Sequence, residues 1–188
     1  MDYSIRRMLA TRGALVAAVA AGAVGLALLA GRLLFGAVSF IGPESVAYVG
    51  SYEPIPFAAV GFGFGVVTSI LPFTIGYFLG LWVVAPITEQ LRIGHVIARA
   101  VLATGIGATL WFVVLGLAGV AGAVTSSPEI LGIAASPSLI AGQLGFALQQ
   151  ALIGFIALLP IGVLGGVFLW LWRSAHPAPH HIEGFIDV

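Results

Sequence analysis

The sequence predicts an all-α integral membrane protein, a bundle of four transmembrane helices. Hydrophobic residues make up 60% of the 188 residues and charged residues only 7%, whereas a soluble domain carries about 25% charged residues. The apolar residues gather in four segments, each longer than the roughly 20 residues that cross a hydrocarbon core. Because a backbone in lipid has to satisfy its own hydrogen bonds, each segment is expected to be a helix.

The chain is expected to form one four-span domain, 1–173, followed by a cytoplasmic tail, 174–188. The spans are predicted at about 13–40, 57–85, 96–124 and 139–172. Residues 1–30 also resemble a signal peptide, with a basic start and an apolar core, and cleavage there would leave three spans. The apolar run is long for such a peptide and no convincing cleavage site follows it, which favours a retained first span.

The arginines predict the orientation of the bundle. Six arginines lie before the first span, around the link 86–95 or at the end of the fourth span: Arg6, Arg7, Arg12, Arg92, Arg99 and Arg173. These places fall on one side of a four-span bundle, and the positive-inside rule makes that side cytoplasmic. Both termini are therefore expected inside. The chain contains no lysine, a usage typical of GC-rich genomes, and the expected location is the bacterial plasma membrane.

The seventh arginine, Arg32, lies inside the first apolar segment. It follows Arg12 by about 20 residues, or about 30 Å of helix, which equals the hydrocarbon thickness. Arg32 is therefore expected at the outer surface, where it extends to headgroups or pairs with Glu44 or Glu53 of the first outer loop. If its side chain faces the bundle interior instead, Arg32 becomes the leading candidate for a functional site.

Proline and glycine predict the shape and packing of the spans. Pro72 and Pro160 lie in the middle of the second and fourth spans, and each is expected to kink its helix. Two GxxxG pairs favour close helix packing, within this chain or between copies: Gly61 with Gly65, and Gly76 with Gly80. The stretches LPFTIGYFLGLW (71–82) and LPIGVLGGVFLW (159–170) both begin with Leu-Pro and end with Leu-Trp. Either a duplicated hairpin or chance similarity in apolar sequence explains this match.

Two groups of polar residues are candidates for a functional or interface role. The first group is spaced for one helix face: Glu89, Arg92, His95 and Arg99. It is interpreted as an orientation-setting cytoplasmic loop, with an ion-pair cluster, a lipid-headgroup contact or a partner dock as alternatives. The second group, Gln149 and Gln150, is expected near the outer surface. There the two amides are interfacial residues, form hydrogen bonds between helices or line a vestibule.

The sequence contains no catalytic signature, and no enzyme activity, cofactor or metal site is expected. Walker, HExxH and GxSxG motifs are absent. The seven acids all fall outside the predicted hydrocarbon, which argues against ion-coupled transport. Three tail histidines lie among prolines that prevent a helix from aligning them: His176, His180 and His181. The formal net charge of +0 gives no field that attracts nucleic acid.

These observations predict a non-enzymatic accessory, assembly or scaffold subunit that acts through helix–helix contacts. The expected partners are the lipid bilayer and either further copies of the chain or a larger membrane complex. The alternative is a small oligomeric permease or channel for a small solute, with the helices that contain Pro72 and Pro160 lining its path.

Overall fold

The computed structural model of the protein describes residues 12–41, 62–88, 91–125 and 137–175. Within these ranges the chain is helical apart from the short segment that joins the second and third helices. Four helices are long and apolar enough to cross a membrane. For the described residues, the predicted all-α class is thereby confirmed, with four helices that are long and apolar enough to span a membrane. The predictions on Gly61, Glu44, Glu53, Glu89 and the tail fall outside the described residues.

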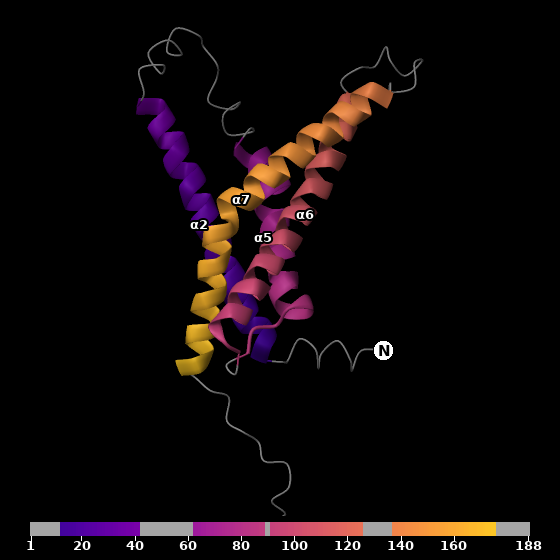
Figure 1. Ribbon diagram of the computed structural model, residues 1–188. Coiled ribbons are helices and arrows are strands. Elements are labelled where there is room, and N and C mark those ends of the chain that lie inside the picture. Colours follow the sequence, from indigo (N-terminus) through magenta and orange to yellow (C-terminus); the bar gives the residue numbers. More distant parts are fainter. Residues whose placement is uncertain (1–11, 42–61, 89–90, 126–136, 176–188) are drawn as a thin grey trace, which may run out of the picture.

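The four helices alternate in direction along the chain (Figure 1). The first is α2, Arg12–Ile41, and the second runs over Phe62–Val84. The third is α6, Ile93–Thr125, and the fourth is α7, Pro137–Ala175. The start of α2, the connection between the second and third helices, and the end of α7 lie together at one end of the bundle. We call this the link end, and the opposite end the far end.

The second helix changes its winding on both sides of Pro72. It begins as an α-helical turn and continues as the π-helical segment η1, Val66–Ile70, then α5, Leu71–Leu79, then the π-helical segment η2, Gly80–Val84. Proline has no N–H and its ring clashes with the carbonyl four residues earlier. The wider π-helical turn of η1, which ends just before Leu71, moves the backbone atoms with which the ring of Pro72 would otherwise clash. The N–H of Leu71 accordingly donates to the carbonyl of Val66, five residues back.

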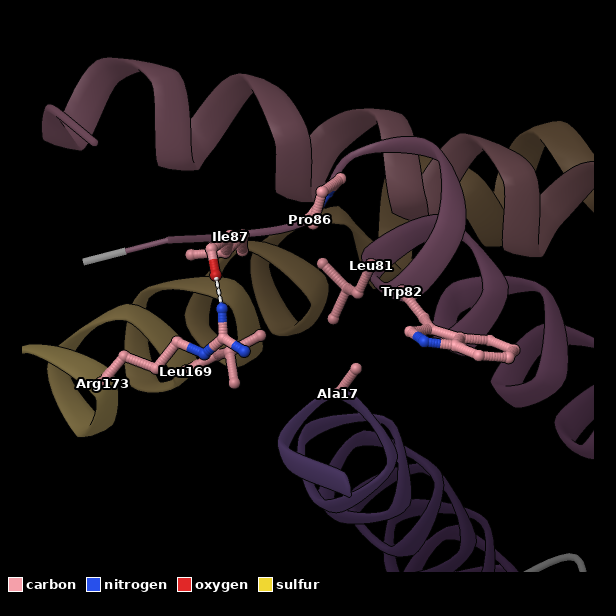
Figure 2. Close-up of a pocket in the computed structure, with 7 residues that line it drawn as sticks. All are labelled: Ala17, Leu81, Trp82, Pro86, Ile87, Leu169 and Arg173. Atoms are coloured by element: carbon pink, nitrogen blue, oxygen red, sulfur yellow. Dashed lines mark hydrogen bonds between the residues drawn. The ribbon is translucent and has the colours of Figure 1, made fainter. Parts of the chain in front are cut away.

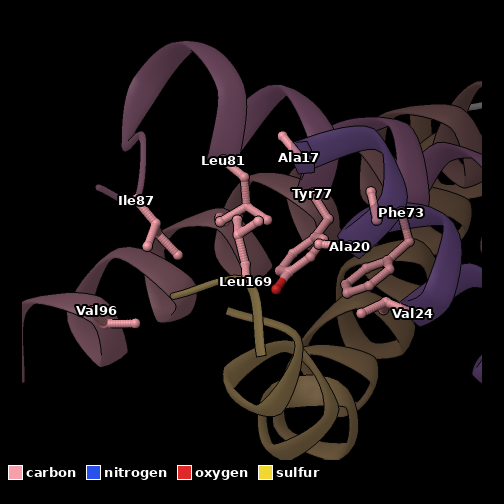
Figure 3. Close-up of a cluster of buried hydrophobic side chains, with 11 residues drawn as sticks. Ala17, Ala20, Val24, Phe73, Tyr77, Leu81, Ile87, Val96 and Leu169 are labelled. Atoms are coloured by element: carbon pink, nitrogen blue, oxygen red, sulfur yellow. The ribbon is translucent and has the colours of Figure 1, made fainter. Parts of the chain in front are cut away.

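The core lies in the half of the bundle nearer the link end, and Figure 3 shows its side chains. Small residues of α2 pack against large ones of α5, and the apolar core residues are Ala17, Ala20, Ala21, Val24, Phe73, Tyr77, Leu81, Ile87, Val96, Ala103 and Leu169. Tyr77 is fully buried and its hydroxyl donates to the carbonyl of Gly162 in α7 at 2.5 Å. The Tyr77 side chain thus joins α5 to α7 through one hydrogen bond and a large buried ring.

Glycines of α7 set its antiparallel register on α6. A Cβ at Gly166 would meet Ala100, one at Gly162 would meet the Thr104 hydroxyl, and one at Gly154 would meet the Trp111 ring. Each glycine therefore lets α6 approach where a larger residue stands opposite. The buried hydroxyl of Thr104 donates to the carbonyl of Ala100 at 2.8 Å, so it carries no unmet hydrogen bond into this interface.

Towards the far end the helices diverge, and α2 leaves α6 and α7 (Figure 1). Leu33 and Leu34 of α2 are 53% and 67% exposed, and Ile156 of α7 is 71% exposed. These apolar faces suit lipid tails or other transmembrane helices. The helix α7 continues through Pro160. Bends at Pro72 and Pro160, and the cytoplasmic location of both termini, stay predictions.

Candidate functional site

The segment at the link end leaves the helical path and buries one side chain. η2 ends at Val84, and Ala85 adopts φ −138° and ψ 64°, which turns the chain out of the helix. The N–H of Ala85 donates back to the carbonyl of Gly80 at 2.8 Å. The next residues are not helical, and Ile87 among them is 1% exposed. Ile87 belongs to the core cluster and anchors the connection against the bundle.

Two arginines hold the backbone of this connection. Arg99 of α6 donates to the carbonyl of Pro86, and Arg173 of α7 donates to the carbonyl of Ile87. A charged donor gives a stronger hydrogen bond than a neutral one. The connection is therefore tied to the third and fourth helices at two consecutive carbonyls. The sequence predicted that both arginines set the orientation and that Arg99 also shares a helix face with Glu89, Arg92 and His95, but nothing in their spacing indicated these bonds.

A cavity of about 230 Å³ lies beside Arg173 (Figure 2). Four parts of the fold meet around it: α2, η2, the connection and α7. The residues that line it are Ala17, Leu81, Trp82, Pro86, Ile87, Leu169 and Arg173. These side chains offer hydrogen-bond donors, at Arg173 and Trp82, and no carboxylate or imidazole. Among the described residues, the cavity therefore has the chemistry of a binding site for an anionic group.

The described residues carry cations without carboxylates. They include five arginines, at 12, 32, 92, 99 and 173, whereas the seven acids of the chain lie outside the described ranges. The guanidinium groups of Arg99 and Arg173 therefore meet backbone carbonyls, not acids, within the part of the chain that the structure describes. The link end presents a positively charged surface there.

The polar residues predicted to share one face at the start of the third helix have different surroundings in the structure. Arg92 directly precedes α6, and its carbonyl accepts the N–H of His95 at 2.9 Å and that of Val96 at 3.2 Å. Arg92 and His95 are exposed, whereas Arg99 is half-buried and turned towards Pro86. The structure thus brings Arg99 to the connection and leaves Arg92 and His95 on the surface.

Arg32 lies near the far end, against the first described turn of the second helix. It is exposed, and its guanidinium carbon lies 6.0 Å from the centroid of the Phe62 ring. A Cβ at Gly65 would stand where this guanidinium lies. Gly65 thus opens space for Arg32, and the contact with Phe62 is of the cation–π type. The pairing expected with Glu44 or Glu53 concerns acids outside the described residues.

The remaining candidate residues lie on helix surfaces and interfaces. Gly76 and Gly80 face α6: a Cβ at Gly76 would lie 2.8 Å from the Cα of Gly107, and one at Gly80 would lie 2.6 Å from the Cα of Ala103. Pro72 is buried and Pro160 exposed, and Gln149 is exposed while Gln150 is half-buried.

Comparison with known proteins adds no relative from which a function can be transferred. No protein-family model matches the chain, and no curated protein or solved structure matches it either. Function has to be argued from the chemistry of the described residues.

Proposed function

We propose that the protein is a non-enzymatic accessory, assembly or scaffold subunit of the bacterial plasma membrane, and that it acts by binding other transmembrane helices. Its termini lie in the cytoplasm, because the arginines of the link end follow the positive-inside pattern. Pro72 and Pro160 bend the second and fourth helices. The bilayer and a partner membrane protein, or further copies of the chain, are its binding partners.

The exposed amide of Gln149 is the observation that supports this proposal. The 39 residues of α7 span about 58 Å, roughly twice the hydrocarbon thickness of about 30 Å. Such a helix fits the bilayer only when it is steeply inclined or extends beyond the bilayer. An inclined α7 brings Gln149 into hydrocarbon, where an amide is costly unless it forms hydrogen bonds with a neighbouring helix.

The surface around Gln149 allows a second helix to approach. Gly145 and Gly142 lie one and two turns before it and are exposed, and a Cβ at either glycine would meet nothing within 4 Å. The exposed Ile153 extends the same face by one turn, at 53% exposure. Small residues beside a glutamine combine close backbone approach with an interhelical hydrogen bond.

The core supports a structural role over a catalytic one. The Tyr77 hydroxyl donates to the carbonyl of Gly162, and the Thr68 hydroxyl donates to that of Phe64 at 2.8 Å. Together with the Thr104 bond, these contacts use the buried hydroxyls to satisfy this chain's own backbone. Such side chains stabilise a bundle and are not directed at a substrate.

A small oligomeric permease is the second candidate, and the irregular second helix favours it. Interrupted helices near the middle of the membrane mark the binding sites of many transporters. Here π-helical segments flank α5 directly before Pro72 and after Leu79. Because the core of a single chain is filled with apolar side chains, a path would form between copies.

Affinity purification from native membranes in mild detergent tests the proposal. Gln149→Leu should lower the recovery of a partner that copurifies with the wild type, because the exposed amide loses its hydrogen bonds. Gln150→Leu is the matched control, since the neighbouring amide points about 100° further round the helix and is half-buried.

Mass spectrometry of the purified material separates the candidates. A different membrane protein at fixed ratio, lost in the Gln149→Leu variant, supports the accessory subunit. Only copies of this chain, together with solute flux in liposomes, would support the permease instead. A monomer from both wild type and variant would refute both candidates.

A further inference from the structure

Arg173 has hydrogen-bonding capacity that the described fold does not use. A guanidinium carries five N–H groups in a planar fork. One Arg173 nitrogen donates to the carbonyl of Ile87, and the guanidinium lies at the edge of the cavity between Ile87 and Ala17 (Figure 2). Donors that border a cavity in this way attract an anion, and a planar fork suits the oxygens of a phosphate.

The other walls of the cavity are apolar, which selects among anions. Ala17, Leu81 and Leu169 line it with methyl and isobutyl groups. A small inorganic anion keeps its hydration shell poorly beside such walls. An anion attached to an apolar body binds both surfaces at once, with its charge on Arg173 and its apolar part along the leucines.

The position of the cavity along the bundle corresponds to the membrane interface. Trp82 lies two residues before the end of the second span, Val84, and Arg173 lies two residues before the end of α7, Ala175. Tryptophan and arginine at the ends of spans mark the headgroup level of a bilayer. The amphiphiles present there are phospholipids, whose phosphates lie at the level of the guanidinium.

We propose that this cavity binds the phosphate of an anionic phospholipid, with Arg173 as the phosphate ligand and Ala17, Leu81 and Leu169 as the apolar wall. The lipid then fills the junction of α2, η2, the connection and α7. The positive charge of Arg99 at the same end raises the local concentration of anionic lipid. This site is independent of the helix surface around Gln149.

Native mass spectrometry of the full chain tests this proposal. The detergent-purified protein is titrated with phosphatidylglycerol and, separately, with zwitterionic phosphatidylcholine. The wild type should retain one phosphatidylglycerol in preference to phosphatidylcholine. Arg173→Gln keeps a donor for the Ile87 carbonyl but loses the charge, and should weaken retention about tenfold, as expected for one charged hydrogen bond. Arg92→Gln removes an exposed arginine at the same end and should retain the lipid.

A second pair of variants keeps the test valid if Arg173→Gln folds poorly. Ala17→Leu fills the cavity and leaves Arg173 in place, so it should also weaken retention. Ala18→Leu adds the same side chain on an exposed position of α2 and should bind as the wild type does. Equal retention by the Ala17→Leu and Ala18→Leu variants would overturn the proposal.

Two further probes address competing anions. Displacement of the lipid by inorganic phosphate at equal concentration would show a site for free phosphate and would overturn the lipid assignment. The chain's own Glu89 follows Ile87 by two residues. Lipid retention that appears only in Glu89→Gln would show that this carboxylate occupies Arg173 in the wild type, and would also refute the proposal.

Discussion

Individual glycines of α7 differ sharply in what surrounds them. A Cβ at Gly154 would run into the Trp111 ring of α6, whereas a Cβ at Gly145 would meet nothing within 4 Å. The two positions are in the same helix, nine residues apart. Substitutions at the two positions can therefore separate the effect of glycine on helix packing from its effect on helix stability.

Gly154→Ala should destabilise the protein, and Gly145→Ala should not. The added methyl at position 154 displaces the Trp111 ring and separates α6 from α7, a type of overpacking that costs about 1–3 kcal/mol. At position 145 the methyl is exposed, and replacing glycine within a helix is neutral or slightly stabilising. Unfolding of both variants in mixed micelles, followed by circular dichroism, measures the difference. Equal unfolding midpoints would contradict the assigned register of α7 on α6.

The sequence indicates which glycines lie between helices better than it indicates which residues of the neighbouring helix they contact. GxxxG spacing singled out Gly76 and Gly80, which the structure places against Gly107 and Ala103. Gly154 has no such motif, and its contact depends on a tryptophan 43 positions earlier in another helix. Because these helices are apolar around their whole circumference, hydropathy gives no indication of which face meets which.

The connection between the second and third helices is the element with the most unusual contacts. Its residues 86–88 are neither α-helical nor part of a sheet, so their carbonyls need other donors. Arg99 and Arg173 supply donors to Pro86 and Ile87. The buried Ile87 side chain adds an apolar anchor to the two bonds.

Arg99→Gln should loosen this connection. The Pro86 carbonyl loses a charged donor, a bond worth about 1.5–3 kcal/mol, so local opening becomes more frequent. Hydrogen exchange of the peptide that contains Ile87 and Thr88 should accelerate about tenfold. Arg92→Gln is the control because Arg92 is exposed at the same end. Unchanged exchange in the Arg99→Gln variant would show that the buried Ile87 side chain and the Arg173 bond hold the connection without Arg99.

The sequence predicted the existence of the elements but not their internal irregularities. Long apolar segments in lipid have to be helices, so four spans follow from composition and length. Pro72 indicated a local disturbance, and the structure shows π-helical segments on both sides of α5. The burial of Ile87 gives no signal in sequence, since a single apolar residue after a proline is typical of many loops.

At the scale of the whole molecule, the helices come together at the link end, and α2 diverges from α6 and α7 towards the far end (Figure 1). Ala14, Ala17, Ala20, Ala21 and Val24 of α2 are buried. Beyond them, where α2 has left the other helices, Leu33 and Leu34 are 53% and 67% exposed. A bundle with this shape leaves its far half available for lipid or for a second protein.

The orientation of the whole molecule can be tested by cysteine labelling, since the chain contains no cysteine. Ser174→Cys lies at the link end and Thr125→Cys at the far end, and both positions are exposed. The positive-inside rule places the arginines of the link end in the cytoplasm. A membrane-impermeant maleimide added to intact cells should therefore label Thr125→Cys and leave Ser174→Cys unlabelled until the cells are lysed. The reverse pattern would place the link end outside the cell, and the cavity beside Arg173 would then face the outer leaflet.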